Sequence, residues 1–479
     1  MVRTELLAVA CLALCACGTD TELTPREGAV CVTHDELRPD SPGAQPGVAP
    51  AYTAQDEVLA FGPADAAVVV HYARSGPHAV GATDADDSGV PDFVELVSSV
   101  YGEVLAKYHD ELGFALPPSD LEVPDGNGGD GRFDAYLLDF NGRADGHFQV
   151  ECLSADAASC PGHMTQENDF AGYGYPSPEA GARIVSSHEY FHAVQAGYDR
   201  RQGAVLGEGA AVWASEQFDP SLDDLEHFSR GYLGAPERPL DEEPTGPVDA
   251  FTYGTALFFE CVTDARGVGV MRRLYESLGE GQPWLPALGA VLAADGGEPL
   301  RPTLRRCFEY NLFTGARARS GYGHARAERL GPAALTTLTG TVSVARVAMY
   351  RTSSRTWRLG GLPDGALVWW APRFDAPASG ADWLEVRVAA DVPGAAPEFS
   401  EVPVQTGHSV SGDVFVMVSH LEAGAPTGPI TLCAGTAAQV EVCRAAAVRP
   451  DGGTPDAGTP DAGTDVPPTP PVGCGCTAT

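Results

Sequence analysis

Two histidines and a glutamate stand at a spacing that suits a metal centre. Residues 184–198 have the sequence Ile-Val-Ser-Ser-His-Glu-Tyr-Phe-His-Ala-Val-Gln-Ala-Gly-Tyr. His188 and His192 are four residues apart, so on a helix both imidazoles leave the same face, one turn apart. Two neutral ring nitrogens placed in this way can bind one zinc ion at about 2.0–2.1 Å each. Glu189 can then act as general base to a water on the open side of the metal.

Local signals predict that this motif lies on a helix. Ser177 can cap the helix start, and Pro178 suits the first helical position, where its missing N–H is not needed. Glu179 adds negative charge near the positive end of the helix dipole, and Gly197 offers a stop. Buried faces are expected from the apolar residues of the segment: Ile184, Val185, Phe191 and Val194.

A third protein ligand is expected from residues 206–216, Leu-Gly-Glu-Gly-Ala-Ala-Val-Trp-Ala-Ser-Glu. Glu208 follows His192 by 208 − 192 = 16 positions, which leaves room for a turn and a second helix packed against the first. The small residues 209–211 permit close approach of two helices. Glu216, eight residues further and on roughly the same face, is the competing ligand or a partner for a histidine N–H.

These two segments resemble the active-site pair of the gluzincin metallopeptidases. More closely, they resemble a family of bacterial secreted metalloproteases with a His-Glu-Tyr/Phe-Phe-His-Ala-Val-Gln helix. The resemblance covers roughly residues 64–315. It implies a zinc peptidase whose third ligand is Glu208, in a turn that opens the next helix. Gly207 stands where many gluzincins have asparagine, and the gap before the glutamate is shorter, so Glu216 stays open as the alternative.

The same resemblance implies two further parts of the site. A tyrosine from the helical region after residue 250 would donate a hydrogen bond to the developing oxyanion, which makes Tyr253 the candidate, ahead of Tyr198 and His227. An edge strand would line the cleft and pair with an extended substrate, and residues 169–175 are the candidate. A pair of core histidines, or a degenerate site without catalysis, is the competing interpretation of the whole pattern.

The first 17 residues predict export. Residues 6–14 form an apolar run that is too short to span a bilayer and is typical of a signal-peptide core. Leu14-Cys15-Ala16-Cys17 resembles the lipobox of bacterial lipoproteins, so Cys17 is the expected lipid anchor; a plain signal peptide cleaved nearby is the alternative. The expected location is the bacterial cell envelope, anchored to the outer membrane or cell surface, or else the medium.

Composition restricts the partners. The chain has 30 lysine and arginine residues against 65 aspartate and glutamate residues, a formal net charge of −35. This charge argues against nucleic acid and against anionic membrane surfaces, so we expect membrane contact only through the lipid anchor. The expected partner is a protein or peptide substrate, and a monomer is expected.

Nine cysteines follow the signal segment, and export makes disulfides the expected state. Spacing favours Cys152 with Cys160, Cys433 with Cys443, and Cys261 with Cys307 across two helical segments. Three cysteines remain: Cys31, Cys474 and Cys476.

An acidic loop after the first predicted strand matches the spacing of a calcium loop. Its oxygen ligands would be Asp84, Asp86, Ser88, the carbonyl of Val90, Asp92 and Glu95. Gly89 allows the sharp turn. A solvated acidic turn is the alternative, and a structural Ca²⁺ is a better fit than a signalling one. A second Gly/Asp-rich loop at 125–134 is better explained as a tight turn than as a cation site.

We expect an α+β fold, in which a zincin-like metallopeptidase domain is followed by an antiparallel β-sandwich domain. Short apolar strands separated by turns at 339–344, 366–370, 384–388, 414–418 and 430–433 predict the sandwich. The expected parts are a lipoprotein signal peptide (1–16), a tether (17–60), the peptidase domain (61–330), the sandwich (331–447) and a disordered tail (448–479).

The sequence thus predicts an exported zinc endopeptidase that hydrolyses peptide bonds with a metal-activated water and a glutamate base. One alternative is a catalytically inactive surface-binding lipoprotein with a relic zinc site. The other is a zinc hydrolase that acts on a different amide, such as a cell-wall peptide.

Overall fold

The computed structural model describes residues 38–39, 50–123, 127–279, 281–294, 296–372, 383–404, 406–423, 425 and 428–447. The predicted signal peptide, the anchor Cys17, most of the tether and the tail lie outside the described residues, as do Cys31, Cys474 and Cys476. No described helix has both the length and the apolar character that crossing a membrane requires.

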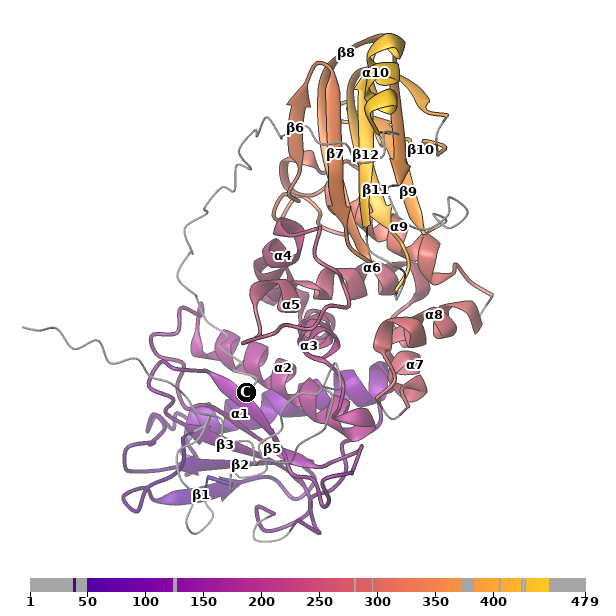
Figure 1. Ribbon diagram of the computed structural model, residues 1–479. Helices are drawn as coiled ribbons and strands as arrows, with labels where there is room; N and C mark the ends of the chain where they lie inside the picture. The colour runs from indigo at the N-terminus through magenta and orange to yellow at the C-terminus, as the bar shows by residue number, and fades with distance from the viewer. Residues whose placement is uncertain are drawn as a thin grey trace, which may run out of the picture.

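A five-stranded mixed sheet forms the N-terminal end of the molecule (Figure 1). Its central strands are parallel, and its two edge strands run antiparallel to their neighbours. In spatial order the strands are β1 (Val58–Phe61), β2 (Val68–Ala73), β3 (Phe133–Leu138), β5 (Gly162–Glu167) and β4 (Gly146–Val150). The edge strand β1 begins inside the range that the sequence assigns to the tether.

Two long helices cover one face of this sheet. They are α1 (Asp92–Leu105), which continues as a π-helix over Ala106–Glu111, and α2 (Pro178–Asp199). Alternate strand residues such as Val70, Leu137 and Met164 point into the shared apolar core beneath the helices. The valines of α1 at 94, 97, 100 and 104 and its Tyr101 are buried in that core.

A group of helices lies between the two sheets of the molecule (Figure 1). They are α3 (Ala204–Phe218), α4 (Asp224–Gly234), α5 (Ala250–Gly254), α6 (Ala256–Arg266), α7 (Gly269–Ser277), α8 (Trp284–Ala294) and α9 (Leu300–Leu312). Residues 219–250 are polar and proline-rich, a composition typical of a loop, yet α4 forms in the first half of this range. Leu225, Phe228 and Tyr232 give α4 a buried apolar face. This face is hard to recognise in the sequence because the residues on either side are polar and proline-rich.

The C-terminal part is a single seven-stranded sheet closed by the short helix α10 (Ala437–Ala447). Its strands are β6 (Thr336–Thr339), β7 (Val342–Met349), β8 (Ser353–Pro372), β9 (Leu384–Ala390), β10 (Ser400–Glu401), β11 (His408–His420) and β12 (Gly428–Gly435). All pairs are antiparallel except β6 with β8. The long strand β8 pairs with β11 along most of its length and with β12 at its end. The strands predicted for a sandwich of two sheets therefore belong to one continuous sheet, whose buried side chains form an apolar core of their own.

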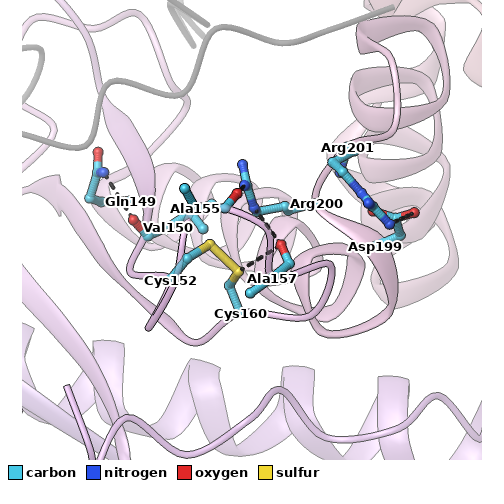
Figure 2. The surroundings of a disulfide bond; sticks show 9 residues. All are labelled: Gln149, Val150, Cys152, Ala155, Ala157, Cys160, Asp199, Arg200 and Arg201. Carbon is cyan, nitrogen blue, oxygen red and sulfur yellow. Dashed lines mark hydrogen bonds and ion pairs between the residues drawn. A yellow bond between two sulfur atoms is a disulfide. The ribbon is translucent and has the colours of Figure 1, made fainter. Parts of the chain in front are cut away.

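All three predicted disulfides are confirmed: Cys152–Cys160, Cys261–Cys307 between α6 and α9, and Cys433–Cys443 between β12 and α10. The first lies in the loop between β4 and β5, against the end of α2 (Figure 2). There the guanidinium of Arg200 donates to the carbonyl of Ala157 at 2.8 Å, and the Cys160 N–H donates to the carbonyl of Ala196 at 3.0 Å. The disulfide loop thus holds the C-terminal end of α2.

Two glycines have roles other than those predicted. α2 runs past Gly197 and ends at Asp199, so this glycine is not the stop. It allows close approach instead, since a Cβ there would lie 3.3–3.4 Å from the prolines at 117 and 118. Gly209 of α3 makes room for Thr255 at the start of α6 rather than for α2.

Removing a disulfide should cost more stability when it closes a longer loop. In the chain-entropy model the Cys261–Cys307 bond, with a sequence separation of 46, contributes about 4 kcal/mol, and Cys152–Cys160, with a separation of 8, about 2.5 kcal/mol. Urea unfolding of the two double Cys→Ala variants measures both losses. Equal losses, or the reverse order, would contradict this ranking.

Candidate metal centre

α2 and α3 bring two imidazoles and a carboxylate together. The side chain of Ser177 accepts a hydrogen bond from the Ala180 N–H at 3.1 Å, so the predicted cap is present at the start of α2, the helix that carries both histidines. Nε2 of His188 lies 3.2 Å from Oε2 of Glu208, and Nε2 of His192 lies 3.4 Å from the same oxygen.

The separations of these donor atoms fit a tetrahedral ion. Two atoms that are each 2.0–2.1 Å from a tetrahedral zinc lie roughly 3.3–3.4 Å apart. One ligand atom from each of His188, His192 and Glu208 lies within 4.8 Å of the other two. Two imidazoles and one carboxylate also match the donor set of catalytic zinc sites, which leave one position open.

Gln195 fixes the tautomer of His192. Its amide nitrogen donates to the carbonyl of Gly207 at 2.8 Å and to the hydroxyl of Tyr275 at 3.0 Å. Its amide oxygen therefore faces Nδ1 of His192 at 2.8 Å, and this ring nitrogen must carry the proton. The lone pair of a neutral His192 then lies on Nε2, directed at Glu208. The sequence gives a signal for this role, since Gln195 follows His192 by three residues, close to one helical turn.

The charges at this centre require a cation. Burial alone would raise the pKa of Glu208, but His192 and His188 outweigh it and lower the pKa to about 2. Burial alone would lower the pKa of His192, but the charge of Glu208 raises it to about 9. Without metal, a proton on His192 balances the buried carboxylate, which is 6% exposed. A divalent cation can take the place of that proton.

Glu189 lies between the histidines and the edge strand β4. It is 2% exposed, and its negative charge adds to the raised pKa of His192. A Cβ on Gly146 of β4 would lie 3.1 Å from Cγ of Glu189 and would collide with Val185, so only glycine fits there. The predicted edge strand at 169–175 is wrong, because that segment consists of turns and bends. The edge strand beside Glu189 is β4, whose sequence is too short and mixed to stand out.

The structure places Tyr253 beside the same centre. Its ring centroid lies 6.0 Å from that of His188, and its ring stacks on Phe228 at 4.8 Å. Of the weaker candidates, Tyr198 accepts a hydrogen bond from the Ala115 N–H at 2.9 Å through its hydroxyl. His227 is exposed on α4, with its ring centroid 4.9 Å from that of Phe228.

The alternative ligand Glu216 points to a different partner. It is buried on α3, two turns beyond Glu208, and forms an ion pair with Arg326. The side chain that the structure brings to the histidines is Glu208.

Asp224 is a neighbour of the centre that the sequence analysis missed. It is buried at the start of α4, and among the described residues its Oδ2 accepts no hydrogen bond. Its pKa is raised to about 6, mainly by burial and also by the charges of Asp145 and Glu226, while His188 opposes the rise. No local pattern marks this residue, because it reaches the centre only through the packing of α4.

The structure also brings together three of the predicted calcium ligands. Asp84, Asp86 and Asp92 have carboxylate oxygens within 4.8 Å of one another, and Glu95, one turn into α1, does not join that group. Asp84 and Asp86 accept the Ser88 N–H at 3.0 and 3.1 Å. Ser88 and Val90 contact each other through the serine hydroxyl. Gly89 has a φ of +84°, as the sharp turn requires. The described part of the second loop, from residue 127, forms a turn as predicted.

Comparisons with known proteins give little beyond this geometry. No family model and no curated protein matches the chain. Among solved structures, the chain is similar to Legionella pneumophila aminopeptidase A in complex with aspartic acid, with 12% sequence identity and a TM-score of 0.29. The match covers 79% of this chain and 37% of that one, less than two thirds of its length.

Zinc binding should release a proton from His192. Because the pKa of His192 without metal is about 9, the ion must displace a proton at any lower pH, whereas Glu208, with a pKa of about 2, is already ionised. We expect the apparent zinc affinity to rise about tenfold per pH unit between pH 6 and 8. Calorimetry in buffers of different ionisation enthalpy should count about one released proton per zinc. A flat pH dependence would contradict this.

Replacing Gln195 should weaken metal binding without removing a ligand. Gln195→Leu frees His192 to rotate or change tautomer and removes the hydrogen bond to the residue before Glu208. Zinc affinity should fall about 10- to 100-fold, as for other residues that orient a ligating histidine. The matched control is Gln217→Leu on α3, where the amide donates to Glu260. If the two variants have equal zinc affinities in a chelator competition, Gln195 does not orient His192 for metal binding.

Proposed function

We propose that the chain is a zinc-dependent endopeptidase. The observation that carries this proposal is the convergence of His188, His192 and Glu208 at separations that suit a tetrahedral ion, with Glu189 beside them. The donor set, the fixed tautomer of His192 and the buried negative charge all favour a divalent cation with nitrogen preference, which is Zn²⁺.

The chemistry divides between the metal and the side chains. Zinc, when bound, polarises a scissile carbonyl and lowers the pKa of a coordinated water. Glu189 takes up the proton of the attacking water and passes it to the leaving amine. Tyr253 donates its hydroxyl hydrogen to the oxyanion that develops on the substrate. Gln195 keeps His192 in its ligating tautomer throughout.

The edge strand β4 is the proposed docking site for the substrate backbone. Among the described strands, β4 pairs with β5 alone, and its Gly146 packs against Glu189. An extended peptide that pairs with the free edge of β4 would pass beside the general base, with backbone hydrogen bonds supplying affinity. Protein or peptide is therefore the proposed substrate class.

The proposal also includes a calcium site, export and the partners of the protein. Asp84, Asp86 and Asp92 would hold a structural Ca²⁺ together with oxygens of Ser88 and Val90, fastening the start of α1. The protein would be exported to the bacterial cell envelope and anchored through Cys17, with no nucleic-acid partner, and would act as a monomer. Its three disulfides fit an oxidising compartment.

Glu189→Gln should separate metal binding from hydrolysis. The amide cannot accept the proton of the attacking water, so kcat/KM on a casein-type substrate should fall at least about 100-fold. Zinc content, measured by atomic absorption, should stay at that of the wild-type protein, because Glu189 is not a ligand.

The matched control is Glu179→Gln, the same change at an exposed position on the same helix. This variant should keep full activity. Unchanged hydrolysis in Glu189→Gln would exclude the proposed mechanism. If the wild-type protein binds zinc but hydrolyses no substrate, the inactive surface-binding lipoprotein is favoured. If it hydrolyses only cell-wall peptides, the zinc hydrolase that acts on a different amide is favoured.

A further inference from the structure

The outer face of the N-terminal sheet, which points away from α1 and α2, is charged yet buried. Residues that alternate with the core-facing ones lie on this face, among them His71 of β2, Asp134 of β3 and His163 of β5. Part of the segment before β1 covers them. The Tyr52 N–H donates to the carbonyl of Pro39 at 3.1 Å, and the Tyr52 hydroxyl donates to the carbonyl of Leu137 at 2.9 Å.

Arg38, just before Pro39, inserts its side chain among the carboxylates of this face. It is 2% exposed. Nε and Nη2 donate to the two oxygens of Glu151 at 2.8 and 2.6 Å, a bidentate pair. Nη2 also donates to Asp120 at 2.5 Å, and Nη1 donates to Asp134 at 2.5 Å. Three carboxylates from separate parts of the chain thus surround one guanidinium.

Two histidines complete the surroundings. Nε2 of His71 lies 2.7 Å from the other oxygen of Asp134, and Nδ1 of His163 lies 3.2 Å from Glu151. Although burial alone would raise the pKa of Glu151, His163 and Arg38 together lower it to about 2. His163 and Arg38 thus keep Glu151 ionised, whereas burial raises the pKa of Asp120 to about 6 although Arg38 opposes the rise. A cation is needed at this cluster, since buried unpaired charges are strongly destabilising.

We propose that Asp120, Asp134 and Glu151 form a guanidinium-binding site, which Arg38 of the same chain fills to fasten the N-terminal segment to the sheet. The two carboxylate oxygens of Glu151, with one oxygen each from Asp120 and Asp134, match the planar guanidinium and its several N–H donors. An ammonium group is a compact charge and cannot make the bidentate pair. Residues 38–39 and 50–57 are then part of the folded domain, although the sequence predicts a tether over 17–60. This site is independent of the metal centre and of peptide hydrolysis.

Arg38→Ala, tested in the full mature chain, should lower the melting temperature by about 10 °C, because it leaves buried carboxylates without their cation. N-Ethylguanidinium carries the atoms that the substitution deletes. At millimolar concentration it should raise the melting temperature of Arg38→Ala in a concentration-dependent way, and ethylammonium should not. The matched control is Arg74→Ala, which removes an arginine paired with Glu57 at the surface, where Arg74 is 59% exposed. This control should change little, and N-ethylguanidinium should not raise its melting temperature.

Arg38→Lys keeps the charge and gives a milder test if Arg38→Ala does not fold. It should also melt well below the wild-type protein, because lysine cannot form the fork. Three results would overturn the proposal: a melting temperature of Arg38→Ala equal to that of Arg74→Ala, equal rescue by ethylammonium, or a wild-type melting temperature for Arg38→Lys.

Discussion

A buried carboxylate between two imidazoles is the constraint on which the candidate site depends. Glu208 is held ionised where water cannot solvate it, so a positive charge must lie against it. Among the described residues, His192 and His188 compensate this charge, and Glu208 in turn raises the pKa of His192 to about 9. A divalent cation could take the place of the proton on His192, which is the condition that a metal-dependent hydrolase needs.

The rest of the N-terminal half holds α2 and α3 in the one register that brings these groups together. α2 is packed against the sheet on one side and α3 on another, and its far end is held by the loop of the Cys152–Cys160 disulfide. Gln195 joins α2 to the residue before Glu208 and to α7, so a single side chain sets both a tautomer and a helix spacing. Such positioning has to be accurate, because small displacements of catalytic groups cost large factors in rate.

Sequence reasoning succeeded where the information was local. The His188–His192 spacing, the Ser177 cap and the three disulfides could be predicted from residues a short distance apart or from simple pairing. It failed where long-range packing decides. β4 becomes the edge strand only because β5 inserts between it and β3, and Gly197 is fixed by two prolines some 80 residues earlier. Arg38 has no local pattern at all, since its partners come from three distant segments.

The N-terminal half contains two buried charge clusters, one around Arg38 and one around Glu208, and their charges are balanced in different ways. On the outer face of the sheet, the chain supplies a permanent cation, and the guanidinium of Arg38 satisfies three carboxylates at once. At the metal centre, the charge of Glu208 is balanced by imidazoles, which can lose their protons. Gln195 already holds His192 in the tautomer that directs Nε2 toward a metal ion. The first cluster gains nothing from an added ion, whereas the second can exchange its proton for one. Metal chemistry is therefore expected at the centre on α2 and α3, and fastening of the chain at the cluster around Arg38.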